Sequence, residues 1–187
     1  YEIPKRDWSS DVCSSDLEEG TDMAVNNIWV FAQVSNGAPT SGTLELLTKA
    51  RSLGSNVSAF MAGDGAAAAA ALGSYGATKV YATGDLAGKL PGVAVSAAMK
   101  AVIDGGDTPD LILFPQNYEG RDVVSRLSVK LDRTVLTNNV DIAVNGDAVS
   151  VTTPVFGGNT LVTTTFTDRK STRLNSSHVS ESRMPSS

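Results

Sequence analysis

The sequence predicts an α/β protein: a three-layer sandwich with a mostly parallel, Rossmann-like sheet and an antiparallel extension near its C-terminal end. Between residues 28 and 131, four short apolar runs alternate with stretches of helical periodicity. That alternation is typical of βαβ units, which place parallel strands side by side. After residue 131 the helical period is lost, and runs rich in β-branched residues follow one another across turn signals. Consecutive strands of this kind form antiparallel hairpins.

The first βα unit begins with an apolar run over residues 28–34, which predicts a buried strand. A turn-rich loop over residues 36–42 leads into a helix over residues 43–53. Gly54 follows this helix, and glycine at this position commonly ends a helix in the left-handed conformation. The spacing turns four side chains of the helix inward: Leu44, Leu47, Ala50 and Leu53.

The second and third units repeat this arrangement. A strand over residues 57–62 precedes an alanine-rich helix, for which Asp64 is a candidate N-cap. A third strand covers residues 79–82. Pro91 then opens a helix that runs to about residue 103, because proline fits the first turn of a helix.

The fourth unit begins with the apolar strand 111–114, which Pro115 ends because proline has no N–H to donate to a neighbouring strand. A helix begins at about residue 119. Its apolar positions recur at helical spacing and are Val123, Val124, Leu127, Val129 and Leu131.

The C-terminal extension consists of four further strands joined by tight reversals. Asn145-Gly146 is a hairpin signal, and residues 157–159 give a second reversal. We expect these strands to form one antiparallel meander beside the parallel sheet. They cover residues 135–139, 141–144, 148–155 and 160–167.

Both ends of the chain differ in composition from the domain over residues 22–168. Residues 1–21 and 169–187 are rich in serine and lack a helical or strand period that could bury a face. They resemble translated sequencing-adapter read-through, and natural disordered tails are the alternative. We therefore expect both ends to be dispensable for folding. They contain Cys13 and His178, the only cysteine and histidine of the chain.

Composition excludes several classes of protein. A net charge of −5 without a basic stripe excludes a general nucleic-acid binder. No apolar run approaches the roughly 20 residues that span a bilayer, so membrane insertion is not expected. Residues 22–168 have no thiol, no imidazole and hence no Cys/His metal site. The sequence shows no recognisable signal or transit peptide, and we expect a cytoplasmic, bacterial protein.

One glycine motif suggests a nucleotide site. Gly63, Gly65 and Ala68 match G-x-G-x-x-A between a predicted strand and a predicted helix, and Asp85 follows the next strand. A pyrophosphate needs such glycines for close backbone approach and an acid for the ribose. An ordinary loop that enters an alanine-rich helix can also begin Gly-x-Gly, so both interpretations stay open.

Charged and amide side chains gather where the fourth strand meets its helix. This hinge lies at the carboxyl edge of a parallel sheet, where open α/β folds bind ligands. A carboxylate beside arginines could position a substrate, but no nucleophile accompanies it, and no catalytic residue is expected. A solvated first helical turn and a partner-docking surface are the alternatives. The candidate docking residues are Asn117, Glu119, Arg121 and Arg126.

Five segments of the domain are distinctive in their sequence and their order. They are TLELLTKAR (43–51), YGATKVY (75–81), GRD with RL (120–127), LTNNVD (136–141) and PVFGGN (154–159). Together they resemble the N-terminal domain of the electron-transfer flavoprotein alpha subunit, and the resemblance covers about residues 25–167. The family usually has an aspartate near Asn139 and often an arginine near Thr153, so this chain departs from it there.

The resemblance implies an alpha/beta heterodimer that carries one FAD. Such a complex takes electrons from dehydrogenases, including the acyl-CoA dehydrogenases of fatty-acid β-oxidation, and passes them to a quinone oxidoreductase. It also implies that most FAD contacts belong to a second alpha-subunit domain, so no cofactor is expected on this chain alone. The chain would then be a scaffold that docks the beta subunit, an electron-carrier part and not an enzyme. The alternative is a free-standing nucleotide-binding domain that uses residues 63–68 and Asp85.

Overall fold

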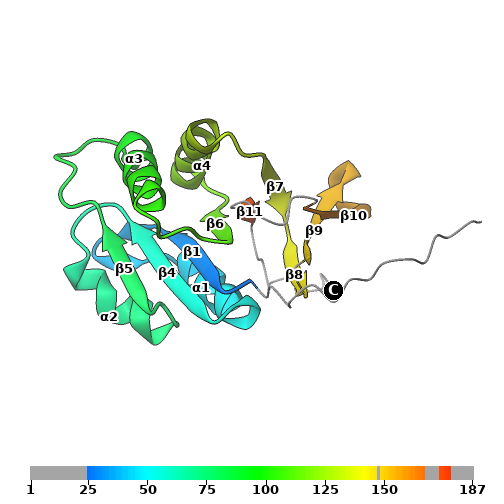
Figure 1. Ribbon diagram of the computed structural model, residues 1–187, viewed down its shortest axis with the longest axis horizontal. Helices are drawn as coiled ribbons and strands as arrows, with labels where there is room; N and C mark the ends of the chain where they lie inside the picture. Colours follow the sequence, from blue (N-terminus) through cyan, green and yellow to red (C-terminus); the bar gives the residue numbers. More distant parts are fainter. Residues whose placement is uncertain (1–24, 147, 167–172, 178–187) are drawn as a thin grey trace, which may run out of the picture.

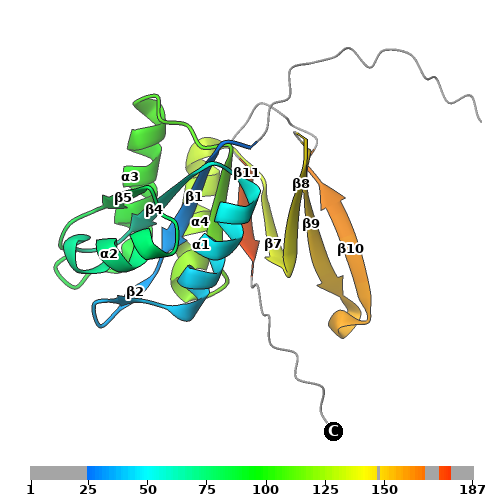
Figure 2. The same ribbon diagram turned by 90° about the horizontal axis from the view of Figure 1, so that it is seen from below.

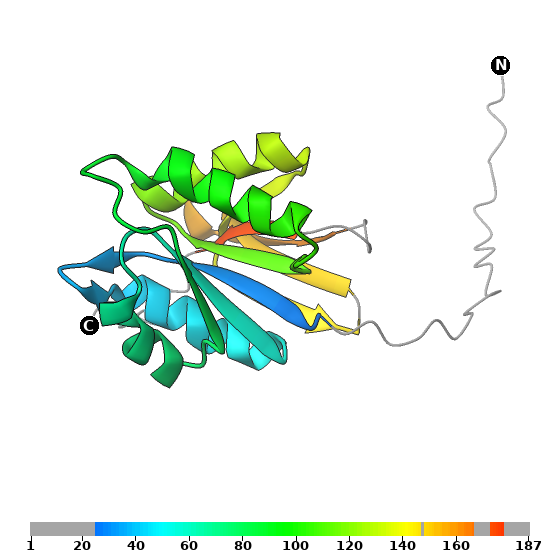
Figure 3. The same ribbon diagram turned by 60° about the vertical axis from the view of Figure 1, so that its left-hand side comes forward.

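The computed structural model describes residues 25–146, 148–166 and 173–177 (Figure 1). The predicted tail over residues 1–21, with Cys13, lies outside the described residues, as does His178. A six-stranded sheet lies between two pairs of helices. In Figure 3, α1 and α2 (cyan to blue-green) lie below this sheet and α3 and α4 (green) lie above it. The helices are α1 (Ser41–Leu53), α2 (Ala66–Ser74), α3 (Pro91–Asp104) and α4 (Tyr118–Leu131).

All pairings within the six-stranded sheet are parallel, and its strand order is β5-β4-β1-β6-β11-β7. This confirms the three-layer, mostly parallel fold. The chain crosses from one face of the sheet to the other between β5 and β6, so α1 and α2 cover one face and α3 and α4 the other. The six strands are β1 (Asn27–Ala32), β4 (Asn56–Met61), β5 (Lys79–Ala82), β6 (Leu111–Pro115), β7 (Val135–Asn139) and β11 (Arg173–Ser177).

The core divides into two clusters because successive strand residues point to opposite faces. On β1, Ile28 and Val30 pack towards α1 and α2, whereas Trp29 and Phe31 pack towards α3 and α4. All four side chains are buried. The continuous apolar runs of β1, β4 and β6 are therefore explained by burial on both faces, as the sequence predicts.

Two details of the helices differ from the prediction. In α1 the fully buried leucines are Leu46 and Leu47, while Leu44 is only partly buried. Gly54 follows α1 in an extended conformation with φ −152°, so the predicted left-handed end is wrong. In α4, Val129 is 82% exposed, because the sheet contacts only one stripe of this helix and residue 129 lies outside it.

A second, three-stranded antiparallel sheet stands beside the first, with β10 on its outer side (Figure 2). It contains β8 (Asp141–Asn145), β9 (Ala148–Val155) and β10 (Thr160–Thr165), with η1 (Phe156–Gly158) between the last two. A small hairpin of β2 (Val34–Ser35) and β3 (Ala38–Pro39) follows β1.

The predicted meander over residues 135–167 is corrected at its first strand. β7 is a parallel strand at the edge of the main sheet, not part of the antiparallel sheet. It follows α4, and a strand that returns after a helical crossover lies parallel to the strand before it. Composition could not distinguish the two outcomes, because β-branched residues favour both kinds of sheet.

The expected disordered tail over residues 169–187 is also corrected in part. Residues 173–177 form β11, which lies between β6 and β7 and pairs with both. Leu174 and Asn175 are completely buried. A strand period was not visible in this serine-rich segment because β11 is short and mostly polar. Its origin as adapter sequence stays a prediction.

Candidate functional site at the carboxyl edge of the sheet

A polar cleft of about 290 Å³ opens where β1 and β4 end. The helices that follow the adjacent strands β1 and β6 lie on opposite faces of the sheet. The edge between these two strands is therefore a topological switch point, where open α/β sheets bind ligands. Four chain segments contribute polar or flexible groups to this cleft. They are represented by Gln33 after β1, Gly63 after β4, Asp85 and Lys89 after β5, and Glu119 on α4.

Gln33 fastens the end of β1 to the start of α4. Its backbone N–H donates to Thr43 Oγ1 over 2.9 Å, and that hydroxyl donates back to the Gln33 carbonyl over 3.1 Å. The Gln33 side-chain oxygen accepts a hydrogen bond from Asn117 Nδ2. Asn117 Oδ1 in turn accepts from the Gly120 N–H over 2.7 Å and caps α4. These hydrogen bonds connect the two sides of the switch point.

Sequence reasoning missed Gln33 and gave no structural role to Gly120. A Cβ on Gly120 would come within 2.1 Å of the Pro115 carbonyl oxygen, so only glycine fits the first turn of α4. The available signal for Gln33 was its place directly after a buried strand. Its partner Asn117 lies 84 residues away, and that separation hid the contact.

The four candidate docking residues do not form one cluster. Asn117 is used as the cap, and Glu119 is partly buried at the cleft. Arg121 is exposed. Arg126 is exposed one turn further along, and its Nε donates to Asp122 Oδ1 over 2.7 Å. The charged side chains therefore lie along the outer face of α4 instead of converging on one point.

A second hollow of about 580 Å³ lies between α3 and α4, beside the ion pair of Asp122 and Arg126. A Cβ on Gly92 would lie 1.7 Å from Asp122 Oδ2, so the absence of a side chain there lets α3 approach the carboxylate. The lining is otherwise mostly apolar. It consists of Leu86, Lys89, Leu90, Val93, Ala94, Asp122 and Arg126.

The predicted nucleotide motif is divided by the fold. Gly63 has a positive φ of 88° with open space beside it, and Gly63 and Asp85 both line the polar cleft. Gly65 lies elsewhere, at the start of α2, where a Cβ would come within 2.9 Å of the Ala82 Cβ. Close packing of α2 on β5 thus accounts for Gly65 without a ligand. Asp64 Oδ1 accepts from the Ala66 N–H over 3.1 Å, but the residue at the N-cap of α2 is Gly65, so the predicted N-cap is wrong by one residue.

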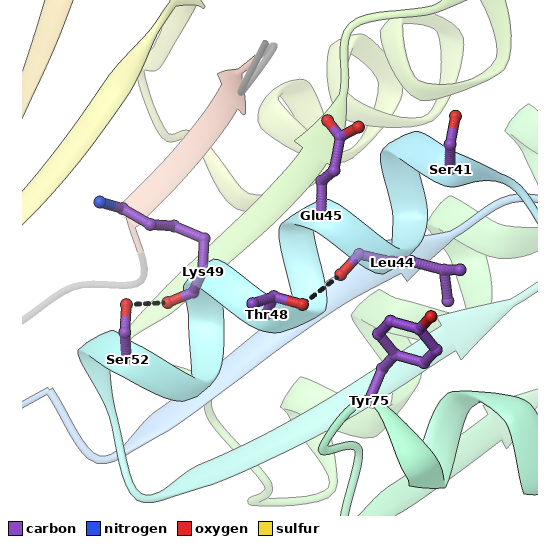
Figure 4. A pocket seen from close by; sticks show the side chains of 7 residues that line it. All are labelled: Ser41, Leu44, Glu45, Thr48, Lys49, Ser52 and Tyr75. Carbon is purple, nitrogen blue, oxygen red and sulfur yellow. Dashed lines mark hydrogen bonds between the residues drawn. The ribbon is translucent and has the colours of Figure 1, made fainter. Parts of the chain in front are cut away.

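A shallow hollow of about 490 Å³ lies on the outer face of α1, where Leu44 points towards the ring of Tyr75 (Figure 4). Three of its polar side chains already have partners. Thr48 and Ser52 donate to carbonyl oxygens of α1, and Lys49 Nζ forms an ion pair with Asp141 over 2.7 Å. The ammonium group of Lys49 holds the pKa of Asp141 below its usual range. These groups are engaged in structural contacts, which argues against a ligand site here.

A partly exposed polar group lies at the opposite, amino edge of the sheet. Tyr81 donates its hydroxyl hydrogen to Asp107 Oδ2, and Lys79 Nζ approaches the same oxygen over 3.1 Å. Burial raises the pKa of Tyr81, and the hydrogen bond from Tyr81 lowers the pKa of Asp107. The Tyr81 ring stacks on Phe60. This group ties β5 to the loop before β6, away from the polar cleft.

Among the residues that the structure describes, no group of three or more histidine, cysteine, aspartate or glutamate side chains could hold a metal ion. In the same part of the chain, the helices are too short or too polar to cross a membrane.

Comparison with known proteins identifies the family that this chain matches. The family model of the electron transfer flavoprotein domain matches residues 28–171. An electron transfer flavoprotein subunit alpha from Syntrophomonas wolfei is 32% identical over 136 residues, which cover 71% of this chain and 42% of the relative. One from Thermoanaerobacterium thermosaccharolyticum is 31% identical over 154 residues, covering 77% and 46%.

The chain therefore spans less than half of the length of the curated relatives it matches. The matched region contains both sides of the polar cleft and the whole antiparallel sheet. The chain belongs to the electron transfer flavoprotein domain family and corresponds to the N-terminal domain of an alpha subunit.

Proposed function

We propose that this chain supplies the scaffold and docking domain of an electron-transfer flavoprotein alpha subunit, with residues 22–168 as the domain proper. In the complete complex, FAD carries electrons from dehydrogenases such as acyl-CoA dehydrogenases to a quinone oxidoreductase. The domain itself takes no catalytic part and binds no flavin alone. The beta subunit is the direct partner, and the bacterial cytoplasm is the site of action.

The family match over residues 28–171 carries this proposal. The surface of α4 supports a docking role. Tyr118 is 90% exposed beside the exposed Arg121, and tyrosine and arginine are enriched among residues that dominate binding energy at interfaces. Their backbone is held in place by the Asn117 cap and by its bond to Gln33. A rigid backbone lowers the entropy cost of binding.

Co-expression with a cognate beta subunit tests the docking role. We expect the chain to co-purify with beta, and Arg121→Glu to weaken that association about tenfold or more, as loss of a complementary charge does. Lys130→Glu is the matched control, since it makes the same charge change in the last turn of the same helix. Equal effects of both variants, or no association of the unmodified chain with beta, would refute this docking surface.

Absorbance spectroscopy tests the absence of flavin. The purified chain is expected to be colourless and to accept no electrons from an acyl-CoA dehydrogenase, because cofactors and not these side chains supply one-electron chemistry. A yellow preparation that is reduced without beta would place a flavin site on this chain.

The alternative function is nucleotide binding at the polar cleft, favoured by the shared position of Gly63 and Asp85 there. Calorimetry with NAD, FAD and AMP tests it. We expect no heat at micromolar ligand concentrations, since Gly65 serves helix packing. Saturable binding that Asp85→Asn abolishes would establish the alternative.

A further inference from the structure

β10 is the outer strand of the antiparallel sheet, and all six of its residues are exposed (Figure 2). Within the part of the chain that the structure describes, β9 is its one neighbouring strand, and the register between the two is uninterrupted. Natural edge strands are commonly protected by lysine, proline or a bulge, because a bare edge pairs with other strands. β10 has the sequence TLVTTT and carries none of these protections.

The surface around this edge is uncharged. Residues 148–166, which include β9, η1 and β10, contain no aspartate, glutamate, lysine or arginine, although these make up 19% of the chain. Phe156 and Leu161 are exposed there, by 83% and 62%. The other edge strand of the sheet, β8, instead begins with Asp141, which is paired with Lys49. Exposed apolar side chains without charged neighbours are typical of a surface that another protein covers.

The outward-pointing main-chain groups of β10 are arranged symmetrically about Thr163. Phe166 N–H donates to the Val149 carbonyl oxygen over 3.0 Å, and this pair continues the register of β10 with β9. In an antiparallel pair, residues alternate between those whose main-chain groups bond the neighbouring strand and those whose groups point away from it. The N–H and C=O groups of Leu161, Thr163 and Thr165 therefore point away from β9.

We propose that β10 pairs with β10 of a second copy of this chain, antiparallel and about a two-fold axis at Thr163. In this register Thr163 faces Thr163 of the other copy, and Leu161 of each copy faces Thr165 of the other. Every outward-pointing main-chain group of these three residues is then paired, and the two three-stranded sheets join into one. A two-fold contact of this kind closes after two copies and does not continue into a fibre.

Charge favours a second copy as the occupant of this edge. The chain has a net charge of −5, so two copies repel each other over most of their surface. Pairing through β10 brings them together where neither has a charged side chain. Pairs of threonine across neighbouring strands are also favourable. This self-association does not depend on docking of the beta subunit, which the proposed function assigns to the surface of α4.

Analytical ultracentrifugation of the purified full chain tests the association. The mass of 19.4 kDa should double as the protein concentration rises. We expect a Kd of about 1–100 µM, since one pair of strands buries less area than a standard stable interface. A chain that stays monomeric up to roughly 1 mM would overturn the proposal, and the edge would then be left to another segment of the chain or to the beta subunit.

Charge substitutions at the two-fold axis test the register. Thr163→Lys and Thr163→Glu each place like charges opposite one another, and each should raise Kd at least about tenfold. An equimolar mixture of the two variants should restore the dimer, because lysine then faces glutamate. Restoration also shows that both variants are folded.

Ala143→Lys is the matched control, since it adds the same charge at an exposed position of β8, on the other edge of the same sheet. It should leave the Kd of the dimer unchanged. A dimer that survives Thr163→Lys, a mixture of the two Thr163 variants that stays monomeric, or an equal effect of Ala143→Lys would overturn the pairing through β10.

Discussion

β6 and β11 are adjacent strands of one sheet, yet they are specified in different ways. β6 is apolar and buried along its whole length, and its sequence alone identifies it as a strand. β11 is mostly polar and shows no strand pattern, although Leu174 and Asn175 are as completely buried as any residue of β6. The difference shows that a position in a sheet can impose strand structure on a segment whose composition does not predict it.

Deletion of residues 169–187 should change the free energy of unfolding more than any other change predicted here. Composition predicts a dispensable end, whereas the structure assigns residues 173–177 to the sheet. We expect a loss of at least about 3 kcal/mol of unfolding free energy, because a fully buried leucine such as Leu174 alone is worth about 2–5 kcal/mol. Urea unfolding measures it. Deletion of residues 1–22 is the comparison and should stay within about ±0.5 kcal/mol. An unchanged midpoint in the C-terminal deletion would show that β6 and β7 do not need β11.

Substitution at a single register pair sharpens the comparison. Leu113 and Asn175 are paired across the two strands, and both are completely buried. Leu113→Ala is expected to cost about 2–5 kcal/mol, since it removes apolar atoms and leaves a cavity. Asn175→Ala should cost less, about 1–2 kcal/mol, because it removes a donor that has no partner but leaves one N–H of the buried Asn139 amide without an acceptor. Chemical denaturation of both variants provides the measurement. Similar losses would mean that Asn175 contributes as much as a core leucine.

Alanine substitution at two glycines should change the free energy of unfolding by smaller amounts and with opposite signs. Gly120→Ala should destabilise the chain by about 1–3 kcal/mol, because its Cβ would overlap the Pro115 carbonyl and disturb the end of β6. Gly42 lies in the first turn of α1 with nothing within 4 Å of an added Cβ. Gly42→Ala should stabilise the chain by about 0.4–1 kcal/mol through a less flexible unfolded state. Thermal unfolding of both variants tests the contrast, and a shift of the same sign would contradict it.

The smallest expected effect concerns the contact between α1 and the antiparallel sheet. The pKa of Asp141 is lowered from 3.8, chiefly by its hydrogen bond with Lys49. A carboxyl group whose pKa is lower in the folded chain stabilises the fold at pH values above its pKa in the unfolded chain. This stability is lost as the pH falls through the pKa of the group in the folded chain. Because both side chains are partly solvated, Asp141→Asn should cost at most about 0.5 kcal/mol at pH 7.

The stability difference between Asp141→Asn and the unmodified chain should shrink as pH falls below about 4 and be lost once the pH is below the lowered pKa of Asp141 in the folded chain. Unfolding curves from pH 7 to pH 2 would show this convergence. A difference that is constant over the whole range would assign the effect of the substitution to packing and not to the charge of Asp141.

The candidate site was predictable only in its location. The carboxyl edge after the fourth strand was expected to hold functional side chains, and Glu119 does line the polar cleft there. The contact between Gln33 and Asn117 joins residues far apart in the sequence, and no local pattern could indicate it. The docking roles of Arg121 and Arg126 stay predictions, because an exposed charge has the same local sequence whether or not a partner covers it.

The sequence by itself determined the elements that a local pattern specifies, either a continuous apolar run or a residue that favours the start of a helix. Apolar runs identify β1, β4 and β6, and Pro91 marks the start of α3 where proline is best tolerated. Tertiary structure alone decided which strands became neighbours. It made β7 parallel, brought residues 173–177 between β6 and β7, and gave Gly65 a packing role. The pairing of strands depends on crossover connections and on surfaces formed by distant segments. The composition of one segment therefore does not indicate which strands become its neighbours.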